Sequence, residues 1–157
     1  RECFMSLRSK IEEKYIQAIK AKNLEETNTY RLIKSAIKDK DIENRTDSSK
    51  EGIGDQKILA LLQSLIKQRK DSIESFETAG RDDLIKKEKS EIDLISQFLP
   101  QQLNKDEIEK LIKELISEKN LSSIKEMGLL MNQLKLNHSG KIDMALAGKI
   151  AKDLLNK

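Results

Sequence analysis

Basic side chains recur at helical spacing in one segment of the chain, an arrangement that suits phosphate binding. Arg31, Lys34 and Lys38 lie three and four residues apart, so they share one face of a predicted helix. Nucleic-acid phosphates bind to such concentrations of positive charge. Acidic residues are interspersed along the whole chain, however, and no aromatic residues alternate with these cations to stack on bases. A solvated helix face is therefore the default interpretation of this pattern alone, and phosphate binding is the alternative.

Nucleophilic and acid–base chemistry has weaker candidates. Ser48, Ser49 and Lys50 match a serine–lysine pairing, but a nucleophile there would need a rigid turn and nearby oxyanion donors, and the segment is a polar loop. His138 is the single histidine and stands in a predicted turn, where a solvated surface position is expected. The sequence contains no phosphate-binding loop, dinucleotide glycine pattern or paired metal motif. We therefore predict no catalytic residues, no metal and no cofactor.

Polar side chains also interrupt the apolar faces of two long predicted helices. Arg69 and Ser72 fall within the apolar face of the first, and Glu88 and Glu91 within that of the second. In an antiparallel pair turning at Gly80, residues equally far from the turn lie level. Arg69 then faces Glu91, and Ser72 faces Glu88. Buried charges are normally paired, which favours a structural ion pair of Arg69 with Glu91 and places Ser72 beside Glu88; the alternative is a polar pocket in which Arg69 is held for a ligand.

The elements that position these residues are predicted to be helices throughout. The chain has 157 residues, of which 37% are hydrophobic and 36% charged, and Ile and Leu supply nearly all of the core because Val and Trp are absent. β-sheets favour Val, aromatic residues and Thr, so the predicted fold class is all-α. One Cys excludes an internal disulfide framework, and no apolar run approaches a membrane span of about 18 residues. We expect a soluble, cytoplasmic protein whose natural start is Met5.

Four helices are predicted before the single proline. They are expected over 7–19, 24–40, 56–79 and 82–98, with a polar loop at 41–54. Asp55 is predicted to cap the third helix, and Gly80 to end it with a positive φ. The third and fourth helices then form a long antiparallel hairpin within an N-terminal bundle.

Pro100 marks the predicted domain boundary, because proline disfavours helical geometry in the residue before it. Capping boxes that begin at Asn104 and Ser123 open new helices beyond it. Three domain segments follow: an N-terminal helical bundle over 5–98, a proline hinge over 99–104 and a small three-helix tail domain over 105–157. We expect the hinge to leave the orientation of the tail less determined than either core.

Several segments of the chain together carry a family resemblance. They are Arg31–Lys38, Arg69–Ile73, Phe76, Ala79–Leu84, Glu88, Glu91, Phe98–Leu103, Met127–Gly128, Met131, Leu134–Lys135 and Gly140–Asp143. In these segments the sequence resembles the YqeY-like family, and the resemblance covers nearly everything from Leu7 to Leu155. The C-terminal part of that family is similar to the tail domain of the B subunit of the glutamine-dependent aminoacyl-tRNA amidotransferase. The turn at 136–139 departs from the family pattern, where a smaller or more basic segment is expected.

The resemblance implies an all-helical protein associated with amidotransferase biology. It implies that the protein binds RNA and has no catalytic centre. The implied partners are transfer RNA and the amidotransferase or aminoacyl-tRNA synthetase machinery. Because the amidotransferase tail helps to hold transfer RNA, the expected RNA-binding residues are mainly tail lysines, with the stripe on the second helix secondary. They are Lys125, Lys135, Lys141 and Lys149, followed by Arg31, Lys34 and Lys38. The alternative is the activity that labels of the family carry, carbon–nitrogen ligation with glutamine as the amide donor.

Overall fold

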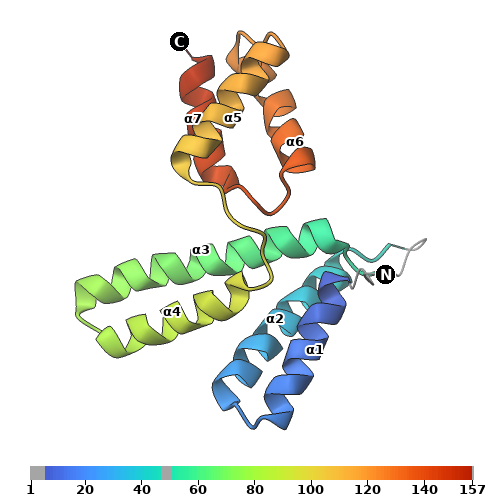
Figure 1. Cartoon of the computed structure of the whole chain (residues 1–157), viewed down its shortest axis with the longest axis vertical. Helices are drawn as coiled ribbons and strands as arrows, with labels where there is room; N and C mark the ends of the chain where they lie inside the picture. The colour runs from blue at the N-terminus through green and yellow to red at the C-terminus, as the bar shows by residue number, and fades with distance from the viewer. Residues whose placement is uncertain (1–5, 47–50, 157) are drawn as a thin grey trace. The chain divides into compact units, whose positions relative to one another are not determined.

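The predicted all-α fold is confirmed by the computed structural model, which describes residues 6–46 and 51–156 (Figure 1). Across these two ranges the chain forms seven α-helices and a short 3-10 helix, with no strand. Their bounds are α1 Leu7–Lys20, α2 Leu24–Glu43, α3 Asp55–Ala79, α4 Asp82–Ser96, α5 Lys105–Glu118, η1 Ile124–Glu126, α6 Met127–Asn137 and α7 Met144–Leu155. None of the described helices is both long enough and apolar enough to cross a membrane. Cys3, Met5 and Ser48–Lys50 lie outside the described residues.

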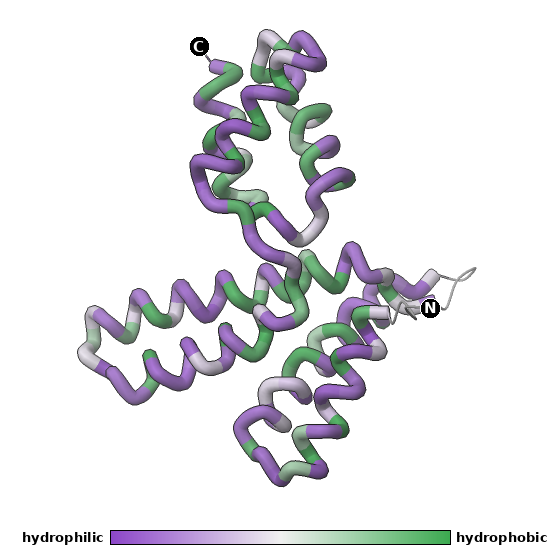
Figure 2. Tube along the Cα trace, viewed as in Figure 1, coloured by the Kyte–Doolittle hydropathy of each residue, from purple (hydrophilic) through white to green (hydrophobic). Residues whose placement is uncertain are grey.

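Packing divides the chain into two compact units, one ending at Leu99 and the other beginning at Pro100. In the first unit, α1 pairs with α2 and α3 pairs with α4, so that two helical hairpins share one apolar core. Apolar and polar residues alternate along α3 and α4 (Figure 2), as expected of amphipathic helices that bury one side. The fully buried side chains of this core include Ile11, Ile33, Ile58, Leu62 and Ile95.

The end of α4 is fixed against α2 by an aromatic contact and a hydrogen bond. The rings of Tyr30 and Phe98 meet edge to face, with their centroids 5.9 Å apart. The Gln97 side-chain amide donates to the Tyr30 hydroxyl at 2.7 Å, so the buried phenol keeps a polar partner. These contacts place the residues that follow α4 beside the first half of α2, the helix that carries the basic stripe.

The predicted end of α3 at Gly80 is confirmed, whereas the predicted cap at its start is wrong. Gly80 adopts a φ of 69°, the left-handed conformation that ends a helix most readily with glycine. The predicted capping by Asp55 is wrong, because α3 already begins at Asp55 and its N-cap is Gly54. The Asp55 carboxylate instead accepts from the backbone N–H of Leu7, at 3.2 and 3.3 Å. An unpaired N–H in the first turn of α1 is thereby satisfied from a distant part of the chain.

The second unit packs α5, α6 and α7 around a core of its own. Its buried side chains include Ile108, Ile112, Leu130, Leu134 and Ile150. Asn104 caps α5 by accepting from the N–H of Glu107 at 2.8 Å, and Ser123 opens η1 by accepting from the N–H of Lys125 at 3.2 Å. The segment before α5 is tied to the turn before α7, because the Leu103 N–H donates to the Lys141 carbonyl at 2.8 Å.

Candidate functional site

A groove of about 420 Å³ lies on the first unit, where α1 packs against α2. Its lining residues are Arg8, Tyr15, Arg31, Lys34, Ser35, Lys38 and Asp41. Four cations therefore line the groove with a single carboxylate. The structure gathers all three basic residues of the predicted α2 stripe here, and adds Arg8 and Tyr15 from α1, which sequence reasoning missed. Arg8 and Tyr15 stand seven residues apart and so share a helix face, which was the available signal.

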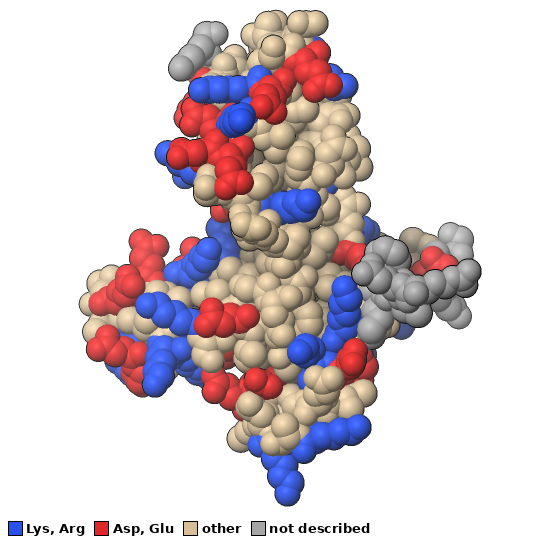
Figure 3. Space-filling model, viewed as in Figure 1, with Lys and Arg blue, Asp and Glu red and all other residues tan. Residues whose placement is uncertain are grey.

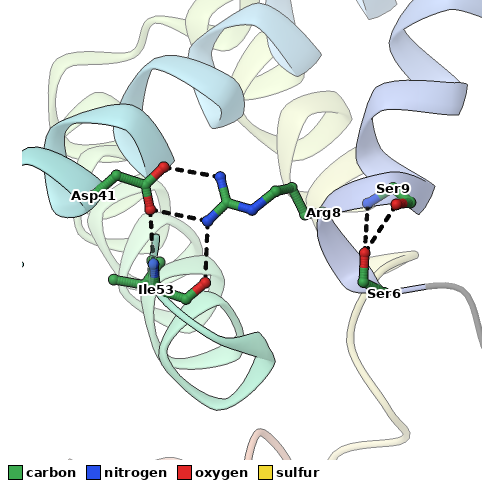
Figure 4. Close-up of polar contacts among 5 residues, drawn as sticks. All are labelled: Ser6, Arg8, Ser9, Asp41 and Ile53. Carbon is green, nitrogen blue, oxygen red and sulfur yellow. Dashed lines mark hydrogen bonds and ion pairs between the residues drawn. The ribbon is translucent and has the colours of Figure 1, made fainter. Parts of the chain in front are cut away.

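Two of the lining residues form an ion pair that also holds the chain after the loop (Figure 4). Arg8 Nη1 lies 2.8 Å from Asp41 Oδ2, and Arg8 Nη2 lies 2.9 Å from Asp41 Oδ1, so the guanidinium is bidentate. Arg8 Nη2 also donates to the Ile53 carbonyl at 3.0 Å, and the Ile53 N–H donates to Asp41 Oδ1 at 2.8 Å. Three segments of the first unit thus meet at a single cluster of hydrogen bonds.

This cluster makes the stability of the first unit depend on pH. The hydrogen bond from Arg8 holds the pKa of Asp41 below its ordinary value of 3.8. A lowered folded pKa stabilises the fold above the unfolded pKa, and that contribution is lost as the pH falls through the folded value. Asp41→Asn is therefore expected to lower the free energy of unfolding at pH 7 by about 1 kcal/mol, because the pair is partly exposed.

Urea unfolding of wild type and Asp41→Asn at pH 7 and pH 2.5 measures this contribution. The difference between the two proteins is expected to shrink as the pH falls, because protonation of the wild-type carboxyl removes its ion pair with Arg8. Asp39→Asn, at an exposed neighbouring position on α2, is the matched control and is expected to show no comparable difference. A difference for Asp41→Asn that is equally large at both pH values would contradict the assignment.

The remaining cations differ in how firmly they are held. Lys34 Nζ lies 2.7 Å from Glu12 Oε2 and 4.2 Å from the centre of the Tyr15 ring, so a carboxylate and an aromatic face both position it. Arg31 and Lys38 are exposed at the groove, and Arg31 reaches Asn28 Oδ1 only at 3.5 Å. These two side chains are therefore the ones best placed to meet an incoming anion.

The polar side chains within the α3/α4 hairpin are arranged as a structural pair. Arg69 Nε donates to Glu91 Oε2 at 2.8 Å, and Arg69 Nη1 donates to the Leu65 carbonyl at 2.9 Å. The side chains of Arg69 and Glu91 are only 9% and 16% exposed. The placement of Ser72 beside Glu88 stays a prediction. The Ser72 hydroxyl donates to the Gln68 carbonyl at 3.0 Å. A serine within a helix commonly donates to the carbonyl four residues earlier in the same helix.

The four tail lysines lie exposed on four different segments of the second unit. Lys125 belongs to η1, Lys135 to the last turn of α6, Lys141 to the turn before α7, and Lys149 to α7 itself. His138 ends α6, where its backbone N–H donates to the Leu134 carbonyl at 3.0 Å. Within residues 6–46 and 51–156, no group of three His, Cys, Asp or Glu residues is arranged to hold a metal ion.

Lysine and arginine side chains are mixed with acidic ones over much of the surface seen in Figure 3, including the α3/α4 hairpin. The mixture agrees with the small net charge of +3. A basic site on this protein is therefore a local arrangement rather than a property of the whole surface. The α1/α2 groove is such an arrangement, because its lining contains four cations and one carboxylate.

Comparison with known proteins identifies a family and several fungal relatives. The family model described as Yqey-like protein matches residues 8–155. An uncharacterized protein of Schizosaccharomyces pombe is 34% identical over 96 residues, which are 61% of this chain and 74% of that protein. Proteins named altered inheritance of mitochondria protein 41, mitochondrial, are 30% identical over 123 residues in Pyrenophora tritici-repentis and 36% identical over 92 residues in Lachancea thermotolerans. The matches cover 75% and 57% of this chain, and 65% and 47% of those two proteins.

Proposed function

The chain belongs to the YqeY-like family, and from that premise we propose that it is an RNA-binding helical protein. Its proposed partner is transfer RNA, bound through the α1/α2 groove and through exposed lysines of the second unit. In this proposal the protein supplies no catalytic centre and acts beside amidotransferase or aminoacyl-tRNA synthetase machinery. The proposal keeps the cytoplasmic location that the sequence predicts. Two of the fungal relatives have the word mitochondrial in their names.

The observation that carries this proposal is the groove between α1 and α2. Arg31 and Lys38 are exposed there, and Lys34 is held in place between them by Glu12 and Tyr15. Lysine and arginine bind phosphate oxygens, and such contacts position a nucleic acid without reading its sequence. A row of phosphates that follows α2 would meet these side chains at successive turns of the helix.

The choice of transfer RNA is supported by the sequence of the second unit. That unit contains the segments that resemble the tail domain of an amidotransferase B subunit, Met127–Gly128, Leu134–Lys135 and Gly140–Asp143 among them. Lys125, Lys135, Lys141 and Lys149 are all exposed there. Phosphate contacts from both units would bind a folded RNA over a larger area than either unit alone.

Fluorescence anisotropy with labelled total transfer RNA, at 50 and 200 mM salt, tests the proposal. Four phosphate contacts are expected to make the affinity fall by about 50- to 150-fold between the two salt concentrations, because each contact releases condensed counterions. Double-stranded RNA of equal length, without the transfer-RNA fold, is the matched probe. Absence of binding at 50 mM salt, or an affinity that salt does not change, would contradict the proposal.

An amide-transfer assay distinguishes RNA binding from the alternative of carbon–nitrogen ligation. Purified protein would be incubated with glutamine and misacylated transfer RNA, and formation of the amidated aminoacyl group would be measured. We expect no amide transfer by this chain alone. Activity that a single Ser or Asp substitution abolishes would overturn the proposal in favour of an amidotransferase.

A further inference from the structure

Arg8 differs from the other cations that line the α1/α2 groove, because its guanidinium holds a carboxylate with two parallel hydrogen bonds. Nη1 donates to Asp41 Oδ2 at 2.8 Å, and Nη2 donates to Asp41 Oδ1 at 2.9 Å. Arginine binds a phosphate group with the same pair of parallel N–H groups. The part of Arg8 that would bind a phosphate of a ligand is therefore occupied by a carboxylate of the protein itself.

A third donor gives this cluster the form of an anion-binding site. The Ile53 N–H donates to Asp41 Oδ1 at 2.8 Å, beside the bonds from Arg8 (Figure 4). Glycine at position 52 lets the backbone lie this close, because a Cβ there would stand 2.7 Å from Arg8 Nη2 and 2.8 Å from Asp41 Oδ1. Arginine side chains and backbone N–H groups are both common donors to phosphate oxygens. Three donors suited to phosphate thus converge on the Asp41 carboxylate.

The cluster is accessible from the groove. The side chain of Arg8 is 44% exposed and that of Asp41 is 20% exposed, so an anion in the groove can reach the guanidinium. Asp41 follows the exposed Lys38 by three residues, and residues at this spacing are neighbours on a helix. A phosphate held by Lys38 would therefore lie beside a guanidinium that attracts it and a carboxylate that repels it.

We propose that Asp41 competes with the phosphates of the ligand, because its carboxylate occupies a phosphate-binding subsite formed by Arg8 and the Ile53 N–H. This inference rests on the proposed function and deepens it, since it concerns the same groove and the same class of ligand, a chain of phosphates. While Asp41 remains bound to Arg8, the guanidinium adds nothing to phosphate binding. Asp41 thereby lowers the affinity of the groove by about the contribution of one charge-assisted contact.

The alternative is that Asp41 only holds the chain that leads into α3. The two roles use the same hydrogen bonds, but they differ in the result expected when the charge is removed. In Asp41→Asn, the amide oxygen can still accept from the Ile53 N–H, while the negative charge that holds the guanidinium is absent. A purely structural Asp41 predicts lower stability and unchanged affinity for this variant, whereas a competing carboxylate predicts lower stability and higher affinity.

Fluorescence anisotropy with labelled total transfer RNA compares the full-length wild type and Asp41→Asn. At 50 mM salt the variant is expected to bind about tenfold more tightly, because Arg8 becomes a further phosphate contact. The slope of log affinity against log salt is expected to become steeper by nearly one. Asp39→Asn, at an exposed position of α2 outside the groove lining, makes the same change in net charge and is the matched control. It is expected to change the affinity by less than about twofold.

Two double variants test whether the gain comes from Arg8. Both Arg8→Gln/Asp41→Asn and Lys14→Gln/Asp41→Asn keep the net charge of the wild type, but only the first removes a cation of the groove. Lys14 is exposed on α1 and lies outside the groove lining. The first double variant is expected to return to within about threefold of the wild-type affinity, and the second to keep most of the gain. Circular dichroism at the same temperature checks that each variant is folded.

Inorganic polyphosphate is the second probe, because it carries phosphates without bases or a folded structure. A gain for Asp41→Asn with polyphosphate, without any binding of transfer RNA, would support the subsite and contradict the proposed function. Transfer-RNA binding that Asp41→Asn strengthens no more than Asp39→Asn does would overturn the subsite and leave RNA binding in place. A gain that Arg8→Gln/Asp41→Asn retains would overturn it equally. Absence of binding to both probes would overturn both proposals.

Discussion

Arg69→Ala is expected to lower the free energy of unfolding by about 3 kcal/mol, the largest effect that we predict for a single substitution in this chain. The substitution leaves the Glu91 carboxylate without its guanidinium partner, in a position where the Glu91 side chain is only 16% exposed. It also removes the donor to the Leu65 carbonyl. The stranded carboxylate has lost much of its water as well as its partner, so removal of one charge costs more than the pair itself contributes.

A double-mutant cycle with Glu91→Leu tests the coupling between the two side chains. The cycle consists of Arg69→Met, Glu91→Leu and the double variant, which replaces both charges by apolar groups and is expected to cost much less than Arg69→Met alone. The exposed pair of Arg81 and Asp83, with side chains 56% and 67% exposed, is the matched control. Arg81→Ala is expected to change the free energy of unfolding by less than about 1 kcal/mol. Urea unfolding measures all of these variants.

A coupling energy near zero between Arg69 and Glu91 would contradict the structural interpretation. The alternative, that Arg69 is held for a ligand, would then be favoured. In that case Arg69→Ala would leave stability nearly unchanged, and its effect would be sought in binding. The two interpretations therefore differ in whether Arg69→Ala destabilises the protein far more than Arg81→Ala does.

The sequence predicts the facing of Arg69 and Glu91 because only local rules are needed for it. Each helix fixes the direction of its side chains through its apolar periodicity, and Gly80 fixes where the hairpin turns. Residues equally far from that turn then lie level. The hydrogen bond of Ser72 could not be predicted in this way, since its hydroxyl donates to the Gln68 carbonyl on its own helix. Two residues that lie level on neighbouring helices are close together, but their positions alone do not determine which hydrogen bond forms.

The groove could not be predicted from the sequence, because helical periodicity does not say which helices pack together. Arg31, Lys34 and Lys38 could be placed on one face of a helix, but the helix that packs beside them is set by tertiary contacts. The same holds for Asp55 and Asp41. Asp55 is a good cap by composition yet binds the Leu7 N–H, and Asp41 lies near the end of α2 yet receives the Ile53 N–H across the loop. Such contacts join residues far apart in the chain, and local propensity says nothing of them.

Charge reversal in the groove is expected to lower the affinity for transfer RNA by about a hundredfold at 50 mM salt. Arg31→Glu/Lys38→Glu removes two exposed cations, each expected to contribute about tenfold through a charge-assisted contact with phosphate. Lys34 is kept, because its contacts with Glu12 and Tyr15 also join α1 to α2. Lys86→Glu/Lys89→Glu, at exposed positions on α4, makes the same change in net charge and is the matched control.

A second charge reversal determines which unit supplies most of the binding. Changing Lys125, Lys135, Lys141 and Lys149 together to Glu is expected to weaken binding strongly if the second unit is the main contact, as its resemblance to an amidotransferase tail implies. For either set of substitutions, the slope of log affinity against log salt is expected to fall by nearly one for each phosphate contact that is lost. Anisotropy with total transfer RNA over a salt series measures affinity and slope together. For the groove set, a loss equal to that of the α4 control would show that net charge alone was responsible. For either set, an unchanged affinity would remove that set from the interface. Because each set lies within one unit, the outcome does not depend on how the two units are oriented when RNA binds.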